Sequence, residues 1–315
     1  MLKKYSWFFF LLSLIPILWI FWKIDYSKLI SLIAQMPIWI FGFLMMTTIL
    51  SILIQVWRVW ILTKVYVPEI TYRELLSYHM ISAFYSIFLP AASQDVIRSS
   101  LLSKKGNYSY IWGATFLSRF AGLVTLLLLS INGFFLLDKS SLPSYTLQSI
   151  GIVLLITIIL ALLSFSKTIT RPLRLLLIKI IPAKIFEIIS NIRNGIYAYK
   201  QHKMILIQFF LISILLQLLF IAACTMILKS ISGHYFIIET IAFIPLIEII
   251  TSAAVFTPQG MGVREVLLVF FFKYLHLSNE ALGIYILIIY LFSIISRLLG
   301  IIPLYKNLFF KKSKL

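Results

Sequence analysis

The sequence MILIQFFLISILLQLLFIAACTMIL at residues 204–228 sets the class of this protein. It contains no charged residue, and Lys203 and Lys229 stand directly at its two ends. A helix needs about 20 consecutive apolar residues to cross the roughly 30 Å of hydrocarbon in a bilayer. These 25 residues therefore predict a helix that crosses a membrane.

Five further apolar runs are candidates for membrane crossing. They occupy residues 7–22, 37–62, 108–137, 150–165 and 281–303. The composition agrees, since 61% of the residues are hydrophobic and 12% are charged, against about 45–50% and 25% in ordinary globular domains. We expect an all-α polytopic membrane protein with about six full transmembrane helices, forming a single domain over residues 1–315.

Basic residues orient these helices. The loop 167–203 carries eight Lys and Arg residues against the single acid Glu187, and four lysines follow position 303 with no acid. Loops rich in Lys and Arg stay in the cytoplasm, so we expect both termini there and the protein in the cell membrane. Within this loop, residues 173–181 place apolar side chains at helical spacing, which indicates an amphipathic helix on the inner leaflet.

Two apolar segments, 75–102 and 238–272, are each broken near the middle. The first contains FLPAASQDVIRSSLL from Phe88, and the second contains FTPQGMGVREVLL from Phe256. Backbone groups freed at such breaks must face protein or a water-filled cavity. We predict two re-entrant helical hairpins that enter from opposite sides, within inverted-repeat halves at roughly 37–137 and 204–303. The alternative is a pair of kinked ordinary helices at each place.

Ionisable residues inside the apolar segments are candidates for function, because facing lipid costs them several kcal/mol. Asp95 and Arg98 share a helix face and could form a purely structural pair. Arg58 and Arg297 lie near helix ends, where the alternative is that they extend to the membrane surface. The predicted substrate-binding set is Asp95, Arg98, Arg119, Glu248, Gly260, Gly262, Arg264 and Glu265.

Arg264 has the most specific setting in this set. It follows the break at Pro258, Gly260 and Gly262, so it is expected at the start of a half-helix, where backbone N–H groups also attract anions. Guanidinium binds phosphate through two parallel hydrogen bonds. For Glu248 and Glu265 the sequence leaves three alternatives open: they balance the charge of the arginines, bind an amine-bearing head group, or carry a proton.

These motifs resemble the transmembrane region of lysylphosphatidylglycerol synthases, in particular stand-alone members without the synthase domain. The matching positions are Pro90, Asp95, Val96, Arg98, Arg119, Gly122, Pro258, Gly260, Gly262, Val263, Arg264 and Glu265. The resemblance implies lipid translocation through a domain with two re-entrant elements. It leaves the cargo open among aminoacylated phosphatidylglycerol, polyprenyl-phosphate sugars and hopanoids, and it leads us to expect no aminoacyl transfer.

The predicted function is the translocation of a phospholipid or a lipid-linked anionic molecule. The alternatives are an ion-coupled small-solute transporter and a non-catalytic membrane partner of a lipid-modifying enzyme. We expect no enzymatic activity, cofactor or metal, because the four histidines are scattered and Cys224 is the single cysteine. Expected partners are membrane lipids and, as a candidate, a lipid-modifying enzyme. Oligomerisation stays open, and nucleic acid is not expected because the basic residues form no single stripe.

Overall fold

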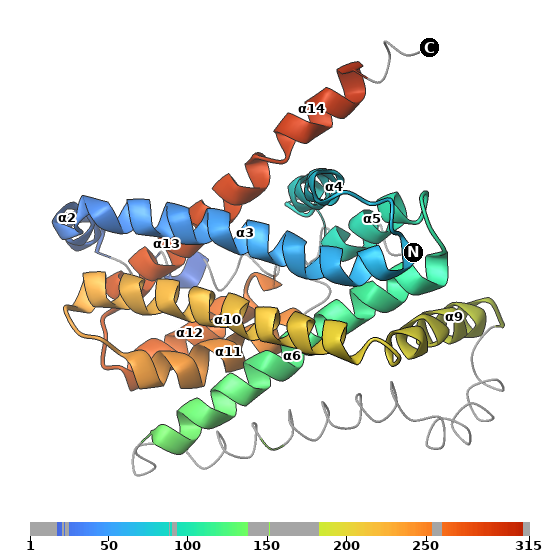
Figure 1. Cartoon of the computed structure of the whole chain (residues 1–315). Coiled ribbons are helices and arrows are strands. Elements are labelled where there is room, and N and C mark those ends of the chain that lie inside the picture. The colour runs from blue at the N-terminus through green and yellow to red at the C-terminus, as the bar shows by residue number, and fades with distance from the viewer. Residues whose placement is uncertain are drawn as a thin grey trace.

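The computed structural model describes residues 18–20, 22, 25–87, 89, 93–137, 151, 183–253 and 260–310, and most of these residues lie in helices. The all-α prediction is confirmed (Figure 1). The helices are α2 (Tyr26–Gln35), α3 (Ile38–Tyr66), α4 (Tyr72–Tyr85), α5 (Ser93–Leu102), α6 (Tyr108–Leu136), α9 (Ala183–Tyr199), α10 (Lys203–Ser232), α11 (Ile237–Ala253), α12 (Val263–Tyr274), α13 (Asn279–Leu298) and α14 (Ile301–Phe310).

Four described stretches are long and apolar enough to cross a membrane. They are Ile38–Tyr66, Tyr108–Leu136, Lys203–Ser232 and Asn279–Tyr305, the last of which joins α13 to the first half of α14. These correspond to four of the six predicted crossings. The predicted crossing at 150–165 and the amphipathic helix at 173–181 lie outside the described residues, except for residue 151, as does most of the crossing at 7–22.

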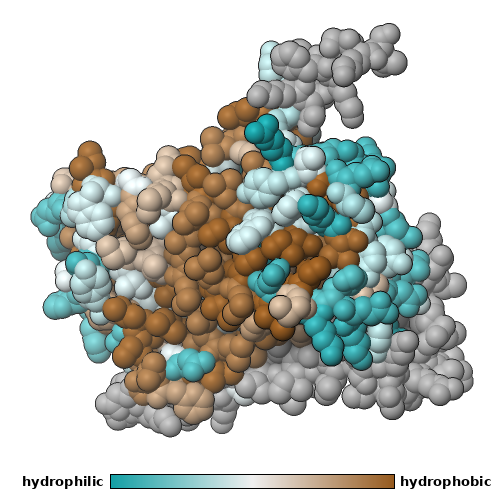
Figure 2. All heavy atoms as spheres, viewed as in Figure 1, coloured by the Kyte–Doolittle hydropathy of each residue, from teal (hydrophilic) through white to brown (hydrophobic). Residues whose placement is uncertain are grey.

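The outer surface of the bundle has the character of a membrane protein. Large apolar side chains of α3 and α10, among them Met46, Ile49, Leu211 and Leu215, are exposed rather than buried. Figure 2 shows apolar residues over the middle of this face, with hydrophilic residues gathered towards the two ends of the bundle. This protein is therefore a multi-pass membrane protein, with lipid as the solvent of its middle zone.

Each interrupted segment folds as helix, break and helix. The segment 75–102 forms α4 and α5, which pack against each other, and the segment 238–272 forms α11 and α12, which do the same. At the second break, Gly260 and Gly262 have φ of +75° and +85°, a left-handed conformation that favours glycine. Insertion of the two hairpins from opposite sides of the membrane stays a prediction.

The same order of helices occurs twice in the described chain. A long helix is followed by two short ones and another long one, first in α3 to α6 and then in α10 to α13. This order falls within the predicted halves at 37–137 and 204–303. Their inverted relation and the single-domain boundary stay predictions.

Small residues bring the two halves into close contact. A Cβ added to Gly133 of α6 would lie 2.4 Å from the backbone nitrogen of Ala242 in α11. One turn away, the Ser130 hydroxyl donates a 2.8 Å hydrogen bond to the Ala242 carbonyl. Glycine and serine at helix crossings in membranes allow such backbone approach. The crossing of α6 and α11 thus holds the two halves of the bundle against each other.

Candidate functional site

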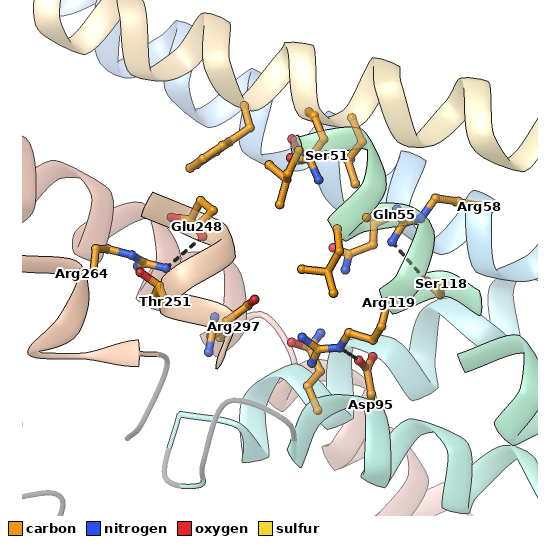
Figure 3. A pocket seen from close by; sticks show the side chains of 18 residues that line it. Ser51, Gln55, Arg58, Asp95, Ser118, Arg119, Glu248, Thr251, Arg264 and Arg297 are labelled. Carbon is orange, nitrogen blue, oxygen red and sulfur yellow. Dashed lines mark hydrogen bonds and ion pairs between the residues drawn. The ribbon is translucent and has the colours of Figure 1, made fainter. Parts of the chain in front are cut away.

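A cavity of about 520 Å³, here called the central chamber, lies between the two halves (Figure 3). Its walls come from α3, α5 and α6 of the first half and α10, α11, α12 and α13 of the second. The lining residues are Ser51, Gln55, Arg58, Gln94, Asp95, Ser118, Arg119, Gly122, Leu123, Leu126, Leu216, Gln217, Phe220, Glu248, Thr251, Ser252, Arg264 and Arg297.

Asp95 is the centre of one charged cluster on the chamber wall. Its Oδ1 lies 2.7 Å from Nη2 of Arg98, and its Oδ2 accepts a hydrogen bond from Nε of Arg119. The Arg98 side chain is only 2% exposed, and its Nη1 lies 3.3 Å from Nδ1 of His79 behind the wall. One carboxylate therefore serves two guanidinium groups, of which only Arg119 lines the chamber.

Arg264 and Glu248 form a second cluster, across the chamber from Asp95 in Figure 3. Nη2 of Arg264 lies 3.3 Å from Oε2 of Glu248, which belongs to α11. Arg264 is the second residue of α12, so it also stands beside the helix N-terminus, as the sequence predicts. The arrangement places a guanidinium and the positive end of a helix dipole on the same side of the chamber.

Glu265, the next residue, turns away from the chamber. It is fully buried, and its carboxylate accepts hydrogen bonds from the Gly262 backbone nitrogen at 2.5 Å and from the Tyr290 hydroxyl. Successive residues of a helix point in different directions, about 100° apart. Glu265, Gly260 and Gly262 therefore shape the break before α12, and none of them lines the chamber.

Arg58 and Arg297 do line the chamber. Arg58 is 6% exposed and donates hydrogen bonds of 3.1 Å to the hydroxyls of Ser118 and Ser213, so it does not extend to the membrane surface. Arg297 donates a 3.1 Å hydrogen bond to the Ser86 hydroxyl at the end of α4. Both guanidinium groups are thus held inward by neutral hydroxyls.

The chamber brings together four of the eight predicted site residues. They are Asp95, Arg119, Glu248 and Arg264. Three amide side chains in its wall, Gln55, Gln94 and Gln217, are absent from the predicted set. A signal for two of them exists, because Gln55 and Gln217 interrupt long apolar runs, and a polar group inside a membrane helix usually faces the protein interior.

A second cavity of about 290 Å³, the apolar lobe, adjoins the chamber. The two cavities share Ser51, Gln55, Phe220, Glu248, Arg264 and Arg297. The remaining wall of the lobe comes largely from apolar side chains of α3, α10 and α13, such as Leu44, Ala223, Ile227, Ile288 and Phe292. The charged central chamber and the apolar lobe therefore meet at Arg264 and Arg297.

Among the described residues, no group of His, Cys, Asp and Glu is arranged to hold a metal ion.

Fold and site together define a multi-pass helical membrane protein with a charged internal chamber. The family model described as "Lysylphosphatidylglycerol synthase TM region" matches residues 6–300, so the chain belongs to this family. No curated protein and no solved structure matches the chain. The family resemblance seen in the sequence is thereby confirmed, and it places the protein in the context of membrane lipids.

Proposed function

We propose that this protein moves a phospholipid or a lipid-linked anionic molecule across the cell membrane. The observation that carries the proposal is the junction of the two cavities: a chamber rich in arginine shares six lining residues with a lobe walled by apolar side chains. An amphiphile has the same two parts. Its anionic head group fits the arginines, and its hydrocarbon chain fits the lobe.

The position of the arginines supports transport over a purely structural role. Charged groups at membrane depth are costly unless they face protein or a water-filled cavity. Arg119, Arg264 and Arg297 all reach the chamber surface, and Arg264 does so beside a helix break, the feature that often marks a transporter's binding site. A chamber built in this way gives a head group a polar route through the hydrocarbon.

The ion-coupled solute transporter is the second candidate, and the same charged chamber favours it. A water-soluble solute would use the chamber alone and leave the apolar lobe without a role. The scaffold for a lipid-modifying enzyme would require neither cavity. For these reasons lipid translocation is the preferred function. We further propose that the protein performs no chemistry on the lipid and that both termini lie in the cytoplasm. A lipid-modifying enzyme is a candidate partner.

The test is lipid movement in liposomes that contain the purified protein. Labelled lipids in the outer leaflet are quenched at intervals, and the rate of exchange is compared with protein-free liposomes. Arg264→Gln should slow the movement strongly, because it removes a chamber charge. Lys273→Gln, on the exposed last turn of the same helix, is the matched control and should retain the wild-type rate. Movement at the wild-type rate in a folded Arg264→Gln protein would reject this site.

A further inference from the structure

We propose that the head group carried by this protein bears two negative charges on phosphate, as a phosphomonoester or a diphosphate does. This inference rests on the proposed function and narrows its substrate class. It separates dianionic lipids from lipids whose head groups carry one negative charge, no net charge or a positive charge.

The charges on the chamber wall do not balance. Four arginines and two carboxylates line it, which leaves two positive charges in surplus. The described charges directly behind the wall leave this surplus unchanged, because Arg98 and Glu265 contribute one charge of each sign. Counting the described lining residues together with Arg98 and Glu265, the protein therefore presents a net charge of about +2 to whatever occupies the chamber.

The contacts show where the surplus lies. Glu248 is engaged with Arg264, and Asp95 is divided between Arg98 and Arg119. The hydrogen-bond acceptors of Arg58 and Arg297 are serine hydroxyls, which carry no charge. In addition, Nε of Arg58 is buried without an acceptor among the described residues, as is Nε of Arg264 in the same chamber wall. Positive charge held in this way inside a membrane is costly until an anion neutralises it.

One dianionic group satisfies this chamber better than the common head groups. A phosphomonoester carries about −1.5 to −2 charges at neutral pH and offers three acceptor oxygens. A phosphodiester carries one negative charge, and an aminoacylated head group would add positive charge to an already positive site. The amides of Gln55, Gln94 and Gln217 supply further donors for phosphate or sugar oxygens around it.

The apolar lobe indicates that this dianion is attached to a hydrocarbon chain. The lobe opens from the chamber at Arg264 and Arg297, so a phosphate held there has apolar side chains within reach of its substituent. Free inorganic phosphate has the same charge without the chain. Movement of a phosphomonoester lipid and uptake of free phosphate therefore have to be measured separately.

The closing experiment measures the movement of four lipids with the same label, one at a time, in liposomes containing wild-type protein. They are a phosphomonoester lipid such as a polyprenyl phosphate, phosphatidylglycerol, phosphatidylethanolamine and lysylphosphatidylglycerol. We expect the phosphomonoester to move about tenfold faster than the others at neutral pH, and this advantage to shrink near about pH 5, where its second charge is lost. A separate arm follows the uptake of radiolabelled inorganic phosphate.

Two variants test whether the surplus charge causes the preference. Arg297→Gln and, independently, Arg58→Gln each remove one positive charge and should reduce the ratio of phosphomonoester to phosphatidylglycerol movement several-fold. Arg73→Gln, on the exposed surface of α4, removes a charge that is not part of the chamber lining and should keep the ratio. An unchanged ratio in both folded chamber variants would overturn the inference.

The remaining outcomes separate the inference from the proposed function. Equal movement of all four lipids, or faster movement of the zwitterionic or cationic lipid, overturns the charge preference and leaves lipid translocation standing. Uptake of inorganic phosphate without movement of any lipid overturns both and favours the solute transporter. No movement of either kind also rejects both and favours the scaffold.

Discussion

Nη1 of Arg58 in α3 donates a 3.1 Å hydrogen bond to Oγ of Ser213 in α10, 155 positions later in the chain. The same guanidinium reaches Ser118 of α6 through Nη2, also at 3.1 Å. One buried side chain thus joins the first helix of each half to a third helix that lines the chamber. This link makes Arg58 a place where stability and transport can be separated by mutation.

Arg58→Met should reduce lipid movement sharply while changing the free energy of unfolding little. Methionine keeps the long unbranched shape, and the Ser213 hydroxyl already donates to the Phe209 carbonyl of its own helix. By contrast, the double change of Ser118 and Ser213 to alanine leaves the buried guanidinium without its acceptors and should cost about 1–3 kcal/mol. Thermal unfolding in detergent together with the liposome assay would check both. Equal destabilisation by the two changes would contradict this assignment.

Asp95→Asn should be among the most destabilising single changes in the described part of the chain. It removes the carboxylate that neutralises Arg98, whose side chain is 2% exposed, and breaking a buried pair costs about 3–5 kcal/mol. Adding Arg98→Met to Asp95→Asn removes the stranded charge and should recover part of the loss. The readout is a double-mutant cycle of unfolding midpoints. Additive losses in that cycle would mean that the two charges are not coupled.

The fold follows from the sequence where composition alone decides it. The runs at 37–62 and 204–228 are helices within a few residues of the predicted limits, because an apolar stretch of that length has few other stable forms in a bilayer. The breaks before Asp95 and Arg264 are also found where small and turn-forming residues interrupt the apolar pattern. These features are local, so the sequence displays them directly.

The composition of the site is less visible, because it depends on which way each side chain faces. Arg58 lies near a helix end, and only the packing of α3 against α6 and α10 shows that it points inward. Arg264 and Glu265 are neighbours in sequence, yet one lines the chamber and the other holds the break. Gln94 lies in α5, and only the tertiary structure shows that its side chain lines the chamber wall.

Gly122→Phe should block lipid movement without unfolding the protein. Gly122 lines the chamber, and a Cβ at this position meets no atom within 4 Å, so a large side chain would extend into open space. Gly42→Phe is the matched control, since Gly42 also has open space around its Cβ but is exposed on α3, away from the chamber lining. Comparable rates for the two variants in the liposome assay would show that the chamber is not the route.

Gly133→Ala should destabilise the protein by about 1–3 kcal/mol through overpacking, although alanine is normally the better helix former. The added methyl would lie 2.4 Å from the backbone nitrogen of Ala242, so α6 and α11 would have to separate. Gly42→Ala makes the same chemical change where the added Cβ meets nothing within 4 Å, and it should be neutral or mildly stabilising. Unfolding midpoints of the purified variants give the comparison, and a neutral Gly133→Ala would reject the close crossing.

Ala223→Trp should stop the movement of long-chain lipids by filling the apolar lobe. Ala223 lies on the lobe wall in α10 and is not part of the chamber lining, so the arginines should still hold a small soluble phosphate. Ala222→Trp, one residue earlier, places the same indole on the exposed side of α10 and should leave movement intact. The two variants are compared in lipid movement and in protection against thermal unfolding by added phosphate. Loss of movement in Ala223→Trp with protection retained would assign the lobe to the hydrocarbon chain. Unimpaired movement would mean that the chain stays in the surrounding lipid while only the head group enters.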